Sequence, residues 1–150
     1  MKPKIAYLTF NDQPSGVYKS QVIDVISYLN DIYDINAKLI AFIPRQNFLK
    51  NKKKIRSWYS NSIIIPILPG LRFWKIQSSI YKIINYFLDY SIILTRGPLA
   101  SYIALTQKKK NQKVIFDARA SVKDEINEYG YLTGHLADKV KYMEFYAIRN

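Results

Sequence analysis

Short apolar runs alternate with longer amphipathic stretches along the whole chain. Five runs are almost continuously hydrophobic, without the alternation of a half-exposed strand, so we expect strands that are covered on both faces. They are Ile5–Phe10, Ala37–Ile43, Ser62–Leu68, Tyr90–Thr95 and Val114–Asp117. Pro66 has no backbone N–H to donate, which favours an edge position or a bulge for the third strand.

The stretches between these strands carry apolar residues at helical spacing. The predicted helices are Val17–Asn30, part of Phe48–Tyr59, Arg72–Leu88, Pro98–Gln107 and Leu136–Ile148. In the first helix the predicted core face is Tyr18, Val22, Val25, Ile26 and Leu29. In the third it is Ile76, Ile80, Ile83, Ile84 and Phe87.

This alternation of strands and helices predicts the fold class. It favours an α/β fold with a doubly wound, Rossmann-like parallel sheet and helices on both faces, in three layers. A chain of 150 residues has the length of a single domain. In such folds the ligand crevice lies outside the carboxyl ends of the strands, which directs attention to the loops Asn11–Gly16, Thr95–Pro98 and Asp117–Glu125.

The loop Asn11–Gly16 joins the first strand to the first helix. Ser15 stands where an N-cap side chain accepts a hydrogen bond from the first turn, and Gly16 lets the backbone approach a ligand closely. The start of a helix carries partial positive charge and unpaired N–H groups, which suits a phosphate or a carboxylate. A plain strand-to-helix turn is the alternative interpretation.

Charged side chains follow the fourth and fifth strands. Arg96 and Gly97 end the fourth strand, where the arginine would reach into the crevice and bind an anion through two points, or would be a surface residue at a tight turn. Asp117 ends the fifth strand, and Arg119 follows it. These two would pair with each other, orient a substrate hydroxyl or cap the next turn, and an ion pair is the favoured role for Asp117.

No pattern typical of a metal site or a catalytic nucleophile is present. The sequence has no cysteine, which excludes disulfides and thiolate ligands. Its one histidine, His135, has no second ligand at suitable spacing, so we expect no metal. No nucleophile elbow or Walker loop is found.

The net charge of +12 is concentrated in the middle of the chain. Lys38 to Lys113 holds 15 basic residues and one acid, for a net of +14, and the rest holds 8 basic and 10 acidic residues, for a net of −2. Such a field favours anionic partners. A compositional bias is the alternative, since 17 of the 23 basic residues are lysine rather than arginine.

Basic and aromatic residues are interleaved within this middle region. The predicted membrane or anion patch consists of Lys52, Lys53, Lys54, Arg56, Trp58, Arg72 and Trp74. Such a mixture suits a membrane interface or single-stranded nucleic acid, and a solvated basic helix with packed aromatics is the third interpretation. No run approaches the length of a membrane-spanning helix, and the apolar run after Met1–Lys4 is too short for a signal peptide.

The order of these segments resembles a known family. Lys4–Leu8 with Ser15-Gly16-Val17, Tyr90–Arg96, Lys113–Arg119 and a closing helix that contains Glu144 together resemble the N-terminal, acceptor-binding domain of retaining glycosyltransferases of the GT-B fold, family 4 type, used in bacterial surface-polysaccharide synthesis. The resemblance covers nearly the whole chain, and its motifs are loose.

The resemblance implies roles for several residues. Ser15 and Gly16 would bind the donor diphosphate, and Arg96, Asp117 and Arg119 would line the acceptor side. The chain departs from the family pattern in two ways: Ser15 replaces one of two glycines, and no histidine lies in the middle of the domain, so no catalytic residue is assigned. The family needs no metal or bound cofactor and uses a nucleotide-sugar as co-substrate.

We therefore expect the N-terminal domain of a hexosyltransferase, shortened by loss of its C-terminal donor domain and nearly inactive by itself. It would transfer a sugar to a glycan or lipid-linked acceptor, in the cytoplasm or peripherally on the inner face of the membrane. The alternative is a non-enzymatic basic α/β module that binds nucleic acid or a partner protein through Lys50–Tyr59, although no nucleic-acid-binding signature is present. A receiver-like or flavodoxin-like domain is a third option, with only Asp12 and Asp117 well placed among the acids that a receiver requires.

Overall fold

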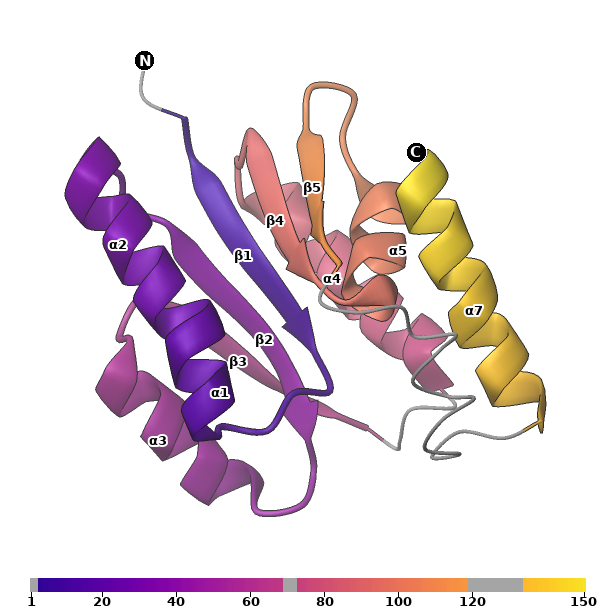
Figure 1. The fold of residues 1–150 in the computed structure, drawn as a ribbon, viewed down its shortest axis with the longest axis horizontal. Helices are drawn as coiled ribbons and strands as arrows, with labels where there is room; N and C mark the ends of the chain where they lie inside the picture. Colours follow the sequence, from indigo (N-terminus) through magenta and orange to yellow (C-terminus); the bar gives the residue numbers. More distant parts are fainter. Residues whose placement is uncertain (1–2, 69–72, 119–133) are drawn as a thin grey trace.

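Five parallel strands form one sheet in a computed structural model that describes residues 3–68, 73–118 and 134–150. The strands are β1 (Ile5–Phe10), β2 (Lys38–Pro44), β3 (Ser62–Ile67), β4 (Ile92–Arg96) and β5 (Lys113–Asp117). Their order is β3-β2-β1-β4-β5 (Figure 1), so the connections reverse direction at β1. This is the doubly wound, Rossmann-like sheet that the sequence predicted. β3 lies at an edge, as Pro66 indicated.

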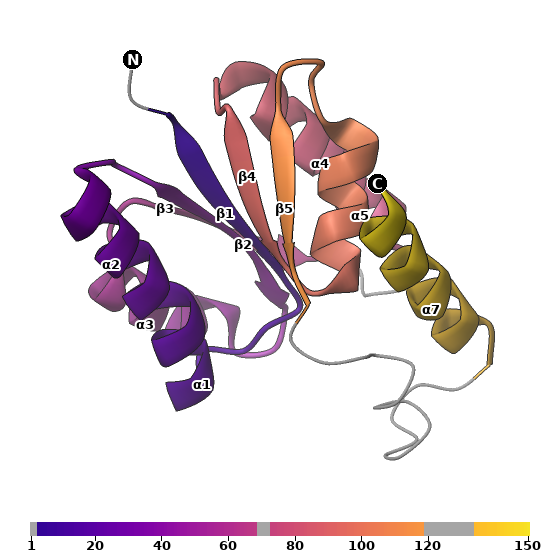
Figure 2. The same ribbon diagram turned by 45° about the horizontal axis from the view of Figure 1, so that its top comes forward.

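Helices cover both faces of the sheet. One face carries a continuous helix made of α1 (Gly16–Tyr18), the π-helical turn η1 (Lys19–Ile23) and α2 (Asp24–Tyr33), together with α3 (Phe48–Trp58). The other carries α4 (Trp74–Phe87) and α5 (Pro98–Gln107), and α7 (Gly134–Arg149) packs on α5. Figure 2 shows the sheet between these two groups of helices. The three predicted layers are therefore confirmed.

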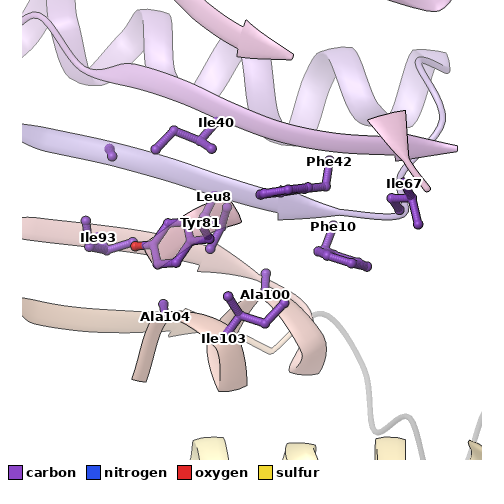
Figure 3. Close-up of a cluster of buried hydrophobic side chains, with 11 residues drawn as sticks. Leu8, Phe10, Ile40, Phe42, Ile67, Tyr81, Ile93, Ala100, Ile103 and Ala104 are labelled. Carbon is purple, nitrogen blue, oxygen red and sulfur yellow. The ribbon is translucent and has the colours of Figure 1, made fainter. Parts of the chain in front are cut away.

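Alternate residues of the central strands point into two separate cores. Leu8 and Phe10 of β1 face α4 and α5, and the ring of Phe10 stacks on that of Phe42 with centroids 5.4 Å apart (Figure 3). Tyr7 of β1 faces the opposite core, which contains Tyr18 and Ile55. Both faces of the central strands are thus buried, which explains why their sequences are continuously apolar.

The predicted core face of α4 is wrong for three of its five residues, while Ile80 and Ile84 pack against the core as predicted. Ile76, Ile83 and Phe87 point outward, and Ile80 and Ile84 are only partly buried. The side chains buried instead are Gln77, Ser78, Tyr81 and Asn85. The physical reason is that the inward amides find partners: Asn85 donates to Gln107 O and to Gln112 Oε1, at 3.0 and 2.9 Å. A largely satisfied polar face can therefore be buried where hydrophobicity alone predicts the reverse, although Gln77 Oε1 and Tyr81 OH have no hydrogen-bond partner among the described residues.

The first helix departs from its prediction at Val25, and Leu29 is only partly buried. Val25 is 38% exposed, and Ile23 takes its place in the core. The π-helical turn at Lys19–Ile23 accounts for the difference, because a wider turn changes which residues face the sheet. Within the described ranges, no helix is both long and apolar enough to cross a membrane.

Candidate functional site at the carboxyl edge of the sheet

Strand register brings three polar residues into one row. Thr9 of β1 lies opposite Arg96 of β4, and Arg96 lies opposite Asp117 of β5. The row stands at the carboxyl ends of the strands, beside β1, where the connections reverse direction. This is the position of the ligand crevice in open α/β sheets. Gly16 follows β1 at the same edge, so the predicted loops share one end of the molecule.

The loop after β1 delivers the helix start to this edge. Asn11 adopts a left-handed conformation, with φ of 64°, and its N–H donates to Phe42 O at 2.8 Å. Ser15 Oγ accepts a hydrogen bond from Tyr18 N at 3.1 Å, which is the predicted N-cap. A Cβ atom added to Gly16 would meet nothing within 4 Å. The backbone at Gly16 is therefore open to a ligand, and the first N–H groups of a helix have no intrahelical acceptor.

Arg96 is the most deeply buried charge of the row, with its side chain only 2% exposed. Its Nη1 lies 3.7 Å from Asp117 Oδ2, and its Nε lies 4.0 Å from Asp12 Oδ1. Its Nη2 donates to Gln21 Oε1 of η1. The guanidinium thus links the end of β5, the loop after β1 and the first helix. In this geometry it holds the site together instead of presenting an open fork to solvent.

Asp117 is the acidic group that this edge presents to solvent, with 47% of its side chain exposed. Its Oδ2 also accepts a hydrogen bond from Tyr7 OH at 3.1 Å. The observed ion-pair partner is Arg96, whereas the sequence suggested Arg119, which lies outside the described residues. One hydrogen bond and one ion pair therefore meet at the same carboxylate oxygen and orient the carboxyl group.

Two tyrosines lie beneath the row. Burial, and then the charge of Asp117, raises the pKa of Tyr7 to about 12. Burial also raises the pKa of Tyr18, whose hydroxyl lies 3.2 Å from Thr9 Oγ1. Both phenols stay protonated at neutral pH, so Tyr7 is a permanent hydrogen-bond donor to Asp117. Sequence reasoning missed Tyr7 and Gln21. The phenol hydroxyl of Tyr7, in an otherwise apolar strand, was the feature of the sequence that could have identified it.

The turn after Arg96 depends on glycine. Gly97 has φ of 80° and ψ of 165°, a region that only glycine adopts without strain. Its N–H donates to Asp117 O at 3.3 Å, and its carbonyl oxygen accepts from Ser101 N at 3.1 Å. Pro98 then begins α5. The turn therefore fixes β4, β5 and α5 to one another next to the polar row.

The predicted basic patch is divided by the sheet. Lys52, Lys53, Lys54, Arg56 and Trp58 lie on α3. Trp74 begins α4 on the other side, half-buried with its ring 5.5 Å from that of Tyr102, and Arg72 lies outside the described residues. Lys54 approaches the candidate site, because its Nζ donates to Pro14 O at 3.1 Å. The structure does not bring the two tryptophans onto one surface.

A shallow hollow of about 530 Å³ lies further along the same edge. It is formed where β2 and β3 end and α3 begins, and its lining includes Arg45, Lys50, Phe48 and Leu68. Two basic side chains over an apolar floor suit an amphipathic anion. Among the described residues, no group of three or more metal-ligating side chains is found, and His135 is exposed at the start of α7.

Comparisons with known proteins bear on the fold. No protein-family model and no curated protein matches the sequence. A solved structure assigned as a UDP-N-acetylglucosamine 2-epimerase from Listeria monocytogenes aligns over 95% of this chain, with a TM-score of 0.64 and 10% identity. Another UDP-N-acetylglucosamine 2-epimerase aligns over 93%, with a TM-score of 0.59 and 12% identity.

The chain spans only 38% and 39% of the lengths of these two proteins. Such enzymes share the GT-B fold with glycosyltransferases. At these identities the likeness concerns the fold alone, and it shows that the chain has the Rossmann-like α/β fold of these sugar-nucleotide enzymes.

Proposed function

We propose that the chain is the N-terminal, acceptor-binding domain of a GT-B glycosyltransferase of the family 4 type. The observation that carries the proposal is the carboxyl edge of the sheet. There an open helix start at Gly16 lies at the same edge as a carboxylate, Asp117, that is fixed by Arg96 and Tyr7. The likeness to sugar-nucleotide enzymes supports the same substrate class.

Each group at this edge has a distinct role in the proposal. The backbone at Ser15 and Gly16 binds the diphosphate of a nucleotide-sugar through the helix N-terminus. Asp117, with Arg119, binds hydroxyl groups of the acceptor, and the hollow at Arg45 and Lys50 supports an acceptor that carries an anionic group. Arg96 acts as a positioning residue, because its guanidinium pairs with Asp117 and Asp12 and donates to Gln21, although its buried Nε makes no hydrogen bond with the described residues.

The wider setting of the proposal comes from the sequence. The acceptor is a glycan or a lipid-linked glycan of surface-polysaccharide synthesis. The enzyme works in the cytoplasm and contacts the inner face of the membrane peripherally. Transfer uses no metal, and the diphosphate leaving group is stabilised electrostatically.

Nucleotide binding by the 150-residue chain tests the donor part of the proposal. Nucleotide-sugars and nucleoside diphosphates are titrated at millimolar concentration, and backbone amide shifts are followed by NMR, with the matching nucleosides as the phosphate-free control. We expect saturable shifts centred on Gly16 and Val17. Gly16→Val removes them, and we expect an unchanged circular dichroism spectrum, because a Cβ atom at this position meets nothing within 4 Å. Absence of shifts with every nucleotide would refute diphosphate binding at this loop.

Epimerisation is a second candidate, favoured by the identity of both structural neighbours. An epimerase converts one nucleotide-sugar into another without an acceptor. NMR of UDP-N-acetylglucosamine incubated with the protein separates the two activities, since inversion at C2 of the sugar requires no added glycan. The nucleic-acid alternative through Lys50–Tyr59 stays a prediction, and a salt-dependent gel shift with single-stranded oligonucleotides checks it.

A further inference from the structure

Helix α4 presents an apolar stripe to solvent. Phe73, Ile76, Ile83 and Phe87 recur at spacings of three, four and seven residues, and each has about half or more of its surface exposed. The values rise from 47% at Ile76 to 59% at Ile83 and 77% at Phe87. Ile80 lies between them in the sequence but packs against the core beneath the helix. Large apolar side chains that are aligned and exposed on one helix face mark an interaction surface.

The orientation of α4 is fixed by hydrogen bonds on its inward face. Asn85 and Gln112 exchange a pair of amide hydrogen bonds at 2.8 and 2.9 Å, and Asn85 also donates to Gln107 O. Gln77 Nε2 donates to Leu68 O near the other end of the helix. Rolling the helix to bury the stripe would break these bonds and leave buried amides unsatisfied. The stripe is therefore held outward.

Basic side chains border the stripe. The sequence of α4 contains no acidic residue, and both of its lysines, Lys75 and Lys82, are exposed beside the stripe. At the end of the helix, Lys109 Nζ donates to Tyr86 O and Leu88 O, at 3.2 and 3.3 Å. Lys108 and Lys110 flank it in the sequence. An apolar stripe with a cationic border is complementary to an anionic bilayer, where apolar side chains enter the interface and lysines meet lipid phosphates.

Helix α2 provides an internal contrast. Tyr28, Ile32 and Tyr33 are also exposed there, but Asp24, Asp31 and Asp34 lie on or next to the same helix. An anionic membrane surface would repel these three aspartates. Helix α7 also exposes Tyr142, Phe145 and Ile148, but its sequence contains Asp138 and Glu144. The sequence of α4 contains no acidic residue, and one exposed acid, Asp89, follows it. Charge complementarity therefore favours α4 among these three helices.

We propose that the outward face of α4, from Phe73 to Phe87, docks on anionic lipid. Phe73, Ile76, Ile83 and Phe87 enter the interface, and Lys75, Lys82 and the Lys108–Lys110 turn contact headgroup phosphates. The inference deepens the membrane part of the proposed function and assigns it to α4 in place of the basic helix α3. Lipid binding itself needs no nucleotide-sugar.

Vesicle flotation with the 150-residue chain tests the apolar part. Vesicles of phosphatidylcholine with about one third phosphatidylglycerol are compared with pure phosphatidylcholine, at low salt and at about 0.5 M salt. We expect binding only to the anionic vesicles at low salt. The double variant Ile83→Ser with Phe87→Ser lowers the affinity for these vesicles at least about tenfold. The matched control, Tyr28→Ser with Ile32→Ser on α2, changes it less than about twofold.

A second pair of variants tests the charge. Lys75→Gln with Lys82→Gln lowers the affinity roughly 30-fold, since each lysine near an anionic surface contributes about a factor of five. Lys52→Gln with Lys53→Gln removes the same charge from α3, which lies on the other side of the sheet, and changes the affinity less than about twofold. The substituted side chains are exposed, except that of Lys52, which is partly exposed. Circular dichroism verifies that each variant is folded.

Three results would overturn the proposal. Loss of binding in the α3 variant equal to that in the α4 variant would assign the surface to α3. Absence of binding to anionic vesicles would remove the membrane partner. A dimer in light scattering that Ile83→Ser with Phe87→Ser dissociates would identify a second copy of this chain as the occupant. None of these results bears on nucleotide binding at Gly16, which the NMR titration tests separately.

Discussion

Replacing Arg96 with methionine removes the one charge that links β4, β5 and the loop after β1. Methionine keeps most of the aliphatic volume, so the change is mainly electrostatic. The lost contacts are those to Asp117 at 3.7 Å, to Asp12 at 4.0 Å and to Gln21. Asp12 and Asp117 then both lose the cation that lies within 4.0 Å of each.

The expected cost follows from burial. Removing one partner of a fully buried ion pair destabilises a protein by about 3–5 kcal/mol, because the other charge is left uncompensated. The side chain of Arg96 is 2% exposed, but that of Asp117 is 47% exposed and can be rehydrated. We therefore expect the lower end, about 3 kcal/mol. Against a total stability of about 5–15 kcal/mol, this is a large fraction.

Equilibrium unfolding in urea, followed by circular dichroism, measures this loss. With a denaturant dependence of about 2 kcal/mol per molar, the midpoint should fall by roughly 1.5 M. Arg45→Met is the matched control, since Arg45 is exposed at the end of β2 and should contribute less than about 0.5 kcal/mol. A loss below about 1 kcal/mol for Arg96→Met would refute a buried, paired guanidinium. Combining it with Asp117→Asn in a double-mutant cycle measures the coupling, expected to be at least about 1 kcal/mol.

Three further predictions concern the site and the opposite edge of the sheet. Gly97→Ala should destabilise the protein by about 1–3 kcal/mol because of its φ of 80°, whereas Gly16→Ala should change stability by less than about 1 kcal/mol; thermal melting compares them. Asn85→Leu should cost about 2 kcal/mol in urea unfolding, because it removes the bond to Gln107 O and both bonds exchanged with Gln112, whose amide keeps Lys109 N and Tyr90 O as partners. Gln112→Leu should cost less in that variant than in the unsubstituted protein, and a fully additive double variant would contradict the paired amides. Tyr7 has a folded pKa of about 12 against an ordinary 10.0, so its contribution to stability is complete below pH 10 and is lost as pH rises toward 12. Tyr7→Phe should flatten this alkaline decline in urea unfolding, and an unchanged pH slope would contradict the raised pKa.

The helix over Arg72–Leu88 illustrates where sequence reasoning failed. Hydrophobic periodicity correctly located the helix but assigned its isoleucines to the core. The actual inward face contains Gln77 and Asn85, whose partners, Leu68 O and the Gln107–Gln112 segment, come from other elements. Periodicity counts only apolar residues, so it cannot register amides that are satisfied by distant groups.

The sequence placed Gly16, Arg96 and Asp117 at one edge of the sheet, as observed, but it did not indicate their partners. Ser15 was correctly expected as an N-cap, because capping is local and depends on three neighbouring residues. The pairing of Asp117 with Arg96 joins residues 21 positions apart, and the bond from Tyr7 spans 110 positions. Trp58 and Trp74 are likewise separated because α3 and α4 cover opposite faces of the sheet.

The order of strands and helices, the parallel sheet and the edge that carries the loops were determined by the sequence itself. Continuous apolar strands must be covered on both sides, and parallel strands must be joined by crossovers. Only the tertiary structure decided which side chains of α4 face outward and which partner neutralises Arg96. Those outcomes depend on hydrogen bonds and charges contributed by segments far apart in the chain, and no local pattern of residues records them.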